Sequence, residues 1–516
     1  MRIVLLVVLF LCSDGALYAQ SPPTEPPTKP PPQTPTGVNK AEKSAAERGS
    51  AQEAKPPEAP SQETKPEPAT KPADRKGPKY FDLRYDEDFS YLDGPEGSYE
   101  KDFFDPIKNI HLGDDWRLTL GGEFRFRMEA ETNKAFGATE PAQDTFTLYR
   151  YLVHTELRYR KLFRVFVQGA AMFDEDRDLA LRPIDENRWD LHQLFFDLRV
   201  LGEDLPLTLR VGRQELSYGN QRLVSPFEWG NIRRRFDGVK LFAKGKTWDV
   251  DLWYAKPVIV QRKQSDRLDE DVDFYGAYVT YKGIPRHGVD VYLFAIDDTG
   301  DALNPNGKRG DRSTYSLGSR FWGKTAGFDY ETEWTGQWGH WAGHTVEAWS
   351  AALDGGYTFE KLAWSPRLGT GFDWASGDRN PFDRQVGTFD QLYPLGHKYF
   401  GFLDLVGRQN ITAANVNLSA WPVPKKVKAA IWYHAFFLSH ERDALYNAGG
   451  GVVRRDRTGL SGKEIGHEVD VTVSWKIDRH SDLLLGWSHL WDGNFIVDTG
   501  VDRDVDLFYV QYAMKF

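Results

Sequence analysis

Apolar and polar residues alternate in one short segment after another between Trp116 and Phe516. The segment 116–129, WRLTLGGEFRFRME, places mainly Leu, Phe and Met side chains on one face and mainly Arg, Glu and Thr side chains on the other. A period of two indicates a β-strand with two different faces. Because one face is apolar and aromatic while the other is charged, the pattern is typical of a strand that separates lipid from water.

The gaps between these segments constrain the fold further. About eighteen segments alternate in this way, and the gaps between them are by turns long and short. The short gaps include 161–162, 245–246, 323–324, 422–424 and 478–480. Outer-membrane barrels have short periplasmic turns and long outer loops. We therefore predict an all-β fold over 116–516, a transmembrane antiparallel β-barrel of about 18 strands. Its last strand, 504–516, ends at the periplasmic side with Phe516 facing lipid.

Composition removes several other classes of protein. No run of 18 or more apolar residues occurs, which excludes helical membrane spans. The net charge of -10 argues against nucleic acid as a partner. Cys12 is the single cysteine and precedes the barrel, so we expect neither disulfides nor a cysteine-based metal site. We expect no cofactor and no metal.

The first 115 residues lack the barrel pattern. Residues 1–19 join Arg2, an apolar run and small residues ending at Ala19, which indicates a secretory signal peptide. Residues 20–78 contain 15 of the 29 prolines and no aromatic residue, which predicts a disordered periplasmic spacer. Residues 79–115 form an acidic segment that we place at the periplasmic mouth, where it plugs the mouth, lines it or is merely solvated.

The charged faces of the predicted strands are rich in arginine. A guanidinium keeps its charge and matches a carboxylate, so a ladder of arginines in the lumen would favour anions. Pairing with Glu and Asp across strands would instead give a rigid structural lattice. A bulge near Gly212 would decide whether Arg213 and Glu215 also turn inward. The predicted pore-lining residues are Arg125, Arg127, Arg150, Arg158, Asp197, Arg199, Arg210, Arg213 and Glu215, with Arg234 at the mouth.

Three stretches carry a resemblance to a known family. They are VGRQELSYGNQRLV…EWGN…RRFDGVKL, DWASGDRNPFD…GTFDQLYPLGHKYFGFLDLVGRQNI and EIGHEVDVTVSW. Their order and spacing resemble the alginate-export outer-membrane proteins over most of 110–516. The resemblance implies a monomeric barrel with an arginine-lined pore for an anionic polysaccharide, partly occluded by loops. It adds Arg408 to the predicted pore-lining residues, whereas Glu215 and the Pro-rich spacer depart from the family pattern.

The long gap 376–408 is aromatic and rich in glycine. Loops of this length usually have a function, so we expect it to fold into the mouth and set the constriction, or to cap neighbouring loops. His340 and His344 have the spacing of helical metal ligands but lie in a Gly-rich turn. The acidic stretch 297–307 lacks the glutamate that ends a calcium loop. No catalytic motif is found.

Three functions follow from this pattern. The first, which we predict, is passive conduction of an anionic, alginate-like polysaccharide or oligosaccharide across the outer membrane. The second is a porin for small anionic solutes such as uronates. The third is an outer-membrane enzyme or a structural barrel. The predicted partners are the saccharide, outer-membrane lipid and periplasmic export or cell-wall components, and we expect a monomer that is not an enzyme.

Overall fold

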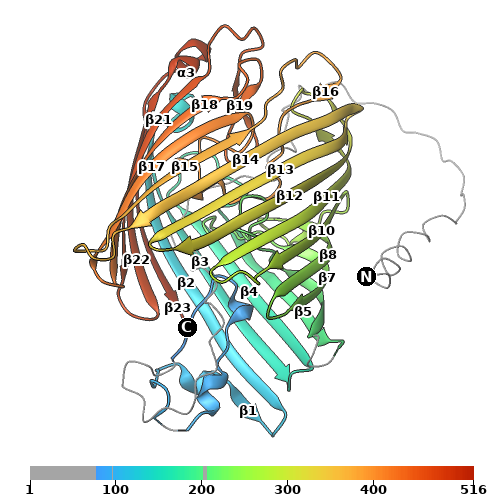
Figure 1. Ribbon diagram of the computed structural model, residues 1–516, viewed down its shortest axis with the longest axis vertical. Coiled ribbons are helices and arrows are strands. Elements are labelled where there is room, and N and C mark those ends of the chain that lie inside the picture. The colour runs from blue at the N-terminus through green and yellow to red at the C-terminus, as the bar shows by residue number, and fades with distance from the viewer. Residues whose placement is uncertain (1–76, 96, 202–205) are drawn as a thin grey trace, which may run out of the picture. The chain divides into compact units, whose positions relative to one another are not determined.

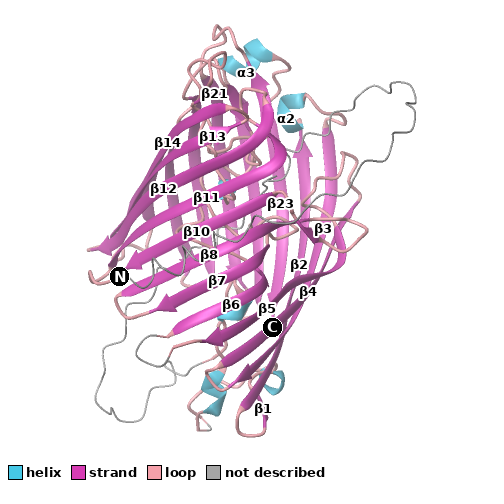
Figure 2. Cartoon of the chain, turned by 90° about the vertical axis from the view of Figure 1, so that its right-hand side faces the viewer, coloured by secondary structure: helices cyan, strands magenta, loops and turns pink. Residues whose placement is uncertain are grey.

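A computed structural model of the protein describes residues 77–95, 97–201 and 206–516. Within this part, eighteen strands form the wall of a β-barrel (Figures 1 and 2). They are β2 (Trp116–Thr132), β3 (Gln143–Tyr159), β4 (Phe163–Glu175), β5 (Asn187–Arg199), β6 (Leu207–Gln214), β7 (Phe236–Lys244), β8 (Trp248–Ile259), β10 (Val272–Tyr281), β11 (His287–Leu303), β12 (Arg309–Thr325), β13 (Phe328–Trp341), β14 (His344–Thr358), β15 (Arg367–Ala375), β17 (Ile411–Val423), β18 (Val427–Leu438), β21 (Glu464–Lys476), β22 (Ser481–Asp492) and β23 (Val505–Lys515).

The wall is closed. Strands that follow one another in the wall pair antiparallel, and the last strand, β23, pairs with the first, β2. The closing register runs from Glu123 opposite Lys515 to Thr132 opposite Asp506. Closure leaves the barrel wall without an open edge. The predicted 18-stranded antiparallel barrel is therefore confirmed.

The connections alternate as the gaps in the sequence do. Short turns such as Ala326–Gly327 lie at one rim, and long loops lie at the other, where Figure 2 shows α2 (Lys134–Gly137) and α3 (Asn494–Thr499). The gap 338–344 contracts to a turn at Ala342 and Gly343. Much of the stretch 297–307 is strand, because β11 continues to Leu303.

The outward face of the wall is apolar. Large side chains such as Phe196, Val211, Trp334 and Leu353 are exposed there, at 46%, 43%, 62% and 57%. Their neighbours along each strand turn inward, as Asp197 does beside Phe196. Among the described residues, no helix has the length and apolarity needed to cross a membrane.

Short strands and 3₁₀ turns lie outside the eighteen strands of the wall. β9 (Arg267–Leu268) and β16 (Gln385–Val386) extend the sheet, and β19 (Ala444–Tyr446) pairs with β20 (Val452–Arg455) in a separate hairpin. The N-terminal segment, meaning the described residues of 77–115, contains η3 (Arg84–Asp86), η4 (Ser90–Asp93), η5 (Asp105–Ile107) and β1 (Ile110–Leu112). Figure 1 shows β1 at the end of the barrel where the C-terminus lies.

Two of the long connections fold into the barrel. We call 215–235, between β6 and β7, inner loop 1, and 376–410, between β15 and β17, inner loop 2. Val224 of inner loop 1 forms a parallel bridge with Tyr393 of inner loop 2. Aromatic side chains of both loops join a core with inward residues of the wall, including Trp253 and Phe274. The two inner loops therefore share a packed core with the inner face of the barrel wall.

Candidate functional site

Three predicted pore-lining arginines hold inner loop 1 in place. Arg125 on β2 donates to the carbonyls of Glu228 and Gly230, at 2.9 and 2.8 Å, and Arg127 donates to that of Trp229 at 3.0 Å. Arg150 on β3 donates to the Glu228 and Gly230 carbonyls, at 2.8 and 3.0 Å. These arginines are 0–2% exposed. The arginine ladder therefore faces inward as alternation predicts, but its guanidinium groups are engaged by the protein's own backbone.

Carboxylates neutralise the same cluster. Arg150 contacts Glu123 at 2.6 Å and Glu228 at 2.5 Å. Arg233 binds Glu215 through two hydrogen bonds of 2.6 and 2.7 Å, and His192 contacts the same carboxylate at 2.8 Å. Burial alone would raise the pKa of Glu215, but Arg233 and the hydrogen bond from His192 outweigh it and lower that pKa to about 2. Glu215 therefore points inward as a buried anion.

The N-terminal segment enters the lumen beside inner loop 1. Tyr85 packs edge-on against Phe166 on β4 and Phe195 on β5, and its hydroxyl donates to the Glu215 carbonyl at 3.0 Å. Arg84 donates to the carbonyl oxygens of Gly122 and Phe516, at 2.7 and 2.9 Å. Gly122 lies on β2 and Phe516 directly follows β23, and these two strands close the barrel. The N-terminal segment therefore binds where β2 and β23 close the barrel, and it occupies part of the lumen.

A second group of predicted residues surrounds Tyr85. Arg210 on β6 binds Asp197 on β5 at 2.7 and 3.0 Å, and its guanidinium lies 4.3 Å from the centre of the Tyr85 ring. Arg164 on β4 shares Asp197 and donates to the Tyr85 carbonyl at 2.6 Å. Arg158 donates to the Glu87 carbonyl at 3.2 Å. These arginines, like those of β2 and β3, hold a backbone segment inside the barrel.

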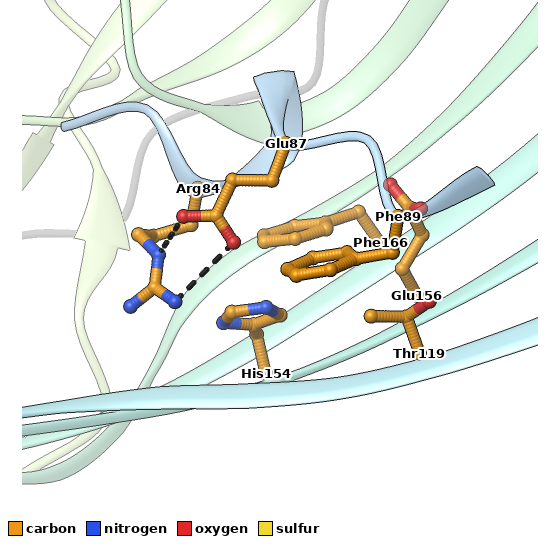
Figure 3. A pocket seen from close by; sticks show the side chains of 7 residues that line it. All are labelled: Arg84, Glu87, Phe89, Thr119, His154, Glu156 and Phe166. Carbon is orange, nitrogen blue, oxygen red and sulfur yellow. Dashed lines mark hydrogen bonds and ion pairs between the residues drawn. The ribbon is translucent and has the colours of Figure 1, made fainter. Parts of the chain in front are cut away.

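The space around this contact is almost filled. Figure 3 shows Arg84 paired with Glu87, and His154 stacked on Phe166 with ring centroids 5.2 Å apart. The cavity between these side chains measures only about 10 Å³. Burial is the largest cause of a raised pKa for Glu87, and the Arg84 guanidinium opposes it. The N-terminal segment therefore packs tightly against the inner wall at this contact.

Inner loop 2 is tied to inner loop 1 by Arg234. Its guanidinium donates to the carbonyls of Ser225 in inner loop 1 and Tyr393 in inner loop 2, at 3.1 and 2.6 Å. Burial lowers the pKa of Arg234 to about 10. Arg408 lies near the C-terminal end of inner loop 2. It contacts Asp373 on β15 at 2.5 Å and is 1% exposed. Both predicted residues therefore position the loops.

The tips of the two loops meet near strands β12 to β14. Arg222 of inner loop 1 pairs with Glu331 on β13 and Asp354 on β14, and lies over the ring of Tyr399 in inner loop 2. Burial lowers the pKa of Arg222, but neighbouring anionic and phenolic oxygens raise it above its usual value. Sequence reasoning did not single out Arg222, because its stretch, NQRLV, has no alternating strand pattern.

A different set of side chains lines the lumen on β15 to β18. Arg367 pairs with Asp329 at 2.6 Å and donates to the side chain of Asn417 at 3.1 Å. Asn417 stands directly opposite Trp432 in the β17–β18 register. We call the following set the β15–β18 strip: Arg367, Asn415, Asn417, Lys428 and Trp432, all of which are partly exposed. The strip joins cationic, amide and aromatic groups on one inner surface.

Arg213 and Arg199 are predicted pore-lining residues that contact neither the inner loops nor the N-terminal segment in the ways described above. Arg213 shares the outward face of β6 with Val211 and pairs with Asp237 on β7 at 2.7 Å. Gly212 has a φ of +130°, and the strand ends at Gln214, after which Glu215 turns inward. Alternation left open whether a bulge near Gly212 turns Arg213 and Glu215 inward, and in the structure only Glu215 does so. Arg199 is the last residue of β5, where it shares the inward face with Asp197 and is in register with Thr208.

The described residues contain no group of three or more His, Cys, Asp or Glu side chains placed to hold a metal ion. His340 is the second-last residue of β13, and His344 is the first residue of β14.

Comparison with solved structures identifies the fold. OccD3 (OpdP) of Pseudomonas aeruginosa is 12% identical with a TM-score of 0.51, over 77% of this chain and 91% of that one. OpdK of Pseudomonas aeruginosa, solved with vanillate, is 10% identical with a TM-score of 0.51, over 77% and 98%. OccAB2 of Acinetobacter baumannii is 11% identical with a TM-score of 0.51, over 77% and 98%. The fold is that of an outer-membrane porin-like barrel.

The family follows from the sequence. The alginate-export family matches residues 116–509, nearly the whole barrel. The chain belongs to the alginate-export family and is an outer-membrane channel. No curated protein matches the chain.

Proposed function

We propose that the protein is a passive channel for an anionic, alginate-like polysaccharide or oligosaccharide. The observation that carries this proposal is the β15–β18 strip. A guanidinium and an ammonium suit the carboxylates of a uronate chain. The neighbouring amides of Asn415 and Asn417 can bond sugar hydroxyls in both directions. The Trp432 ring packs against Phe402 of inner loop 2 and offers the part that stays exposed to a sugar face.

The arginine-rich half of the lumen has another role in this proposal. Arg125, Arg127 and Arg150 bind the backbone of inner loop 1, and Arg158 and Arg210 hold the N-terminal segment. These contacts place inner loop 1 and the N-terminal segment on the β2–β6 side, whereas inner loop 2 also contacts β18 and β21. The conduction path that we propose therefore runs along the opposite side, past the β15–β18 strip.

A second candidate is a porin for small anions such as uronates. It is favoured by the extent to which the lumen is filled, because the N-terminal segment and both inner loops all pack inside the wall. A polymer needs a wider continuous path than a monosaccharide. Deleting residues 378–398 of inner loop 2 should raise the single-channel conductance if that loop sets the constriction. Unchanged conductance would count against an occluding role.

The two candidates are separated by current block in planar bilayers. Oligouronates of increasing length should block the current at lower concentration as length increases, because longer chains contact more of the strip. Neutral oligosaccharides of the same length are the control. Arg367→Met should weaken the block by about tenfold, as expected for one lost charged contact. Block that depends on charge but not on chain length would favour the small-anion porin. Cation selectivity would contradict both candidates.

The placement of the chain in the cell is part of the proposal. Residues 1–76, which carry the predicted signal peptide and nearly all of the predicted spacer, lie outside the described residues. We propose that the rim of short turns, the N-terminal segment and the C-terminus face the periplasm. A monomer and contacts with periplasmic export or cell-wall components remain predictions.

A further inference from the structure

Lys398 stands at the junction of the two inner loops. It ends the 3₁₀ turn η6 (Gly396–Lys398), and its side chain is exposed although the residues on both sides of it, His397 and Tyr399, are buried. Its ammonium donates a hydrogen bond to the side-chain oxygen of Asn220 in inner loop 1. The Tyr399 hydroxyl donates to the backbone carbonyl of the same Asn220. The junction is therefore built around one exposed cation.

The neighbouring cations differ from Lys398 in their partners. Arg222 is buried and paired with Glu331 and Asp354. Arg320 on β12 contacts Glu331 at 2.5 Å and Asp290 at 2.7 Å. The Asn220 amide that accepts from Lys398 is neutral, and it also donates to Glu331 at 3.0 Å. An ammonium whose hydrogen-bond acceptor is neutral keeps its full charge for a passing anion.

We infer that Lys398 sets the anion selectivity of the channel by binding a carboxylate of the passing solute at the loop junction. This inference rests on the proposed conduction of anionic saccharides and adds the contact that selects them. The ammonium has three N–H donors, so it can engage a carboxylate while it retains Asn220. Charged side chains that line a pore determine which ions it passes.

The charges around Lys398 make this contact sensitive to pH. Limited hydration inside the barrel lowers the pKa of Lys398 to about 7, with Arg222 and Arg320 acting in the same direction. Asp354 on β14 and Asp82 of the N-terminal segment oppose them. Because the folded pKa lies below the ordinary value of 10.5, the charge is present below about pH 7 and is lost above it. Anion selectivity should therefore fall as the pH rises through neutrality.

The test is the reversal potential of the full-length protein in planar bilayers under a KCl gradient. Between pH 5.5 and pH 9, the anion-to-cation permeability ratio should fall at least about threefold. Lys398→Met should remove this dependence and give the low ratio at both pH values. Lys398→Arg should keep the high ratio at pH 9, because a guanidinium stays charged. Lys263→Met, an exposed lysine in the loop after β8, is the matched control.

The outcomes separate this inference from the proposed function. An anion-selective protein whose Lys398→Met variant keeps the pH dependence would overturn the inference alone. Cation selectivity of the unmodified protein at every pH would overturn the proposed function. A second readout does not need current: after ¹³C-dimethylation of lysines, the resonance missing in Lys398→Arg should titrate near pH 7 and shift when a diuronate is added. A resonance that titrates near pH 10 and does not shift would also overturn the inference.

Discussion

The Tyr85 ring of the N-terminal segment lies edge-on against the Phe195 ring of β5, with centroids 5.2 Å apart and planes at 87°. Phe195 is an inward residue of the wall and is 0% exposed. A residue from before the first strand therefore lies within the barrel. Edge-on aromatic pairs contribute about 0.5–1.5 kcal/mol beyond the burial of their surface, so Tyr85 is a principal anchor of the segment.

Replacing Tyr85 should release the segment. Tyr85→Ala removes two aromatic contacts and the hydrogen bond to the Glu215 carbonyl, and truncation of a buried aromatic costs about 3–5 kcal/mol. We expect a higher single-channel conductance and faster tryptic cleavage after Arg84, since that bond becomes accessible. Phe81→Ala is the control, because Phe81 lies in the same segment but is 45% exposed. Equal conductance and cleavage in the two variants would show that Tyr85 does not anchor the segment.

The wall could be predicted from the sequence because each strand carries its own pattern. In β3, the alternation assigns Arg150 and His154 to the lumen and Tyr151 and Val153 to lipid, and the structure agrees. Period-two patterns depend only on local geometry and on the two solvents that a strand separates. The parity of long and short connections then orders the strands.

What fills the lumen could not be predicted in the same way. Alternation places Arg125 and Arg127 on the inner face, but it does not reveal whether a solute or a loop lies opposite. Inner loop 1 reaches these arginines through its backbone carbonyls, which every sequence has. Lys398 was missed because its exposure depends on how two distant loops meet. Such contacts arise from tertiary packing, which a single sequence does not display.

Arg150 should be essential for stability. Arg150→Ala would leave the buried Glu123 carboxylate without its closest cation and would remove one of the two arginine donors to the Gly230 carbonyl. Removing one partner of a buried ion pair costs about 3–5 kcal/mol. We expect a lower unfolding temperature, measured by the shift in gel mobility on heating in detergent. Arg160→Ala, whose ion pair with Asp115 is exposed at the short-turn rim, should leave that temperature unchanged.

A double variant tests whether the unpaired Glu123 carboxylate causes this loss of stability. Combining Glu123→Gln with Arg150→Met removes both charges, so no unpaired charge stays buried. Part of the lost stability should return, although the Glu228 and Gly230 carbonyls keep only Arg125 as an arginine donor. If the double variant is less stable than Arg150→Ala, the ion pair is not the cause of the effect.

Arg234 should control how firmly the two inner loops hold together. Arg234→Met removes the donor shared by the Ser225 and Tyr393 carbonyls. The Tyr393 carbonyl keeps the Ser225 N–H as a donor, whereas the Ser225 carbonyl loses its guanidinium donor, and a buried group left unpaired costs about 1–3 kcal/mol. We expect larger and more frequent current fluctuations in single-channel records, because the loops can separate. Arg379→Met is the control within inner loop 2, since Arg379 makes an exposed contact with His440. Quiet records from Arg234→Met would contradict a clamping role.

Lys108 gives the attachment of the N-terminal segment a pH dependence. Its ammonium donates to the Leu120 carbonyl on β2. Burial lowers its pKa to about 8, with Arg84 acting in the same direction and Glu87 and Asp102 opposing it. The released segment has the ordinary value of 10.5 and so binds more protons between these values. By linkage, attachment should strengthen as the pH rises from about 8 to 10.5, by about 3 kcal/mol at most.

Proteolysis measures this attachment directly. Cleavage of the segment should slow as the pH is raised from 7.5 to 10, after correction for the activity of the protease on an unstructured peptide of the same sequence. Lys108→Met keeps most of the packing volume and lacks the titrating group, so its corrected cleavage rate should vary much less with pH. The same slowing in Lys108→Met would assign the effect to another group. Faster cleavage of the unmodified protein at high pH would show that the ammonium form of Lys108, rather than the neutral amine, holds the segment in place.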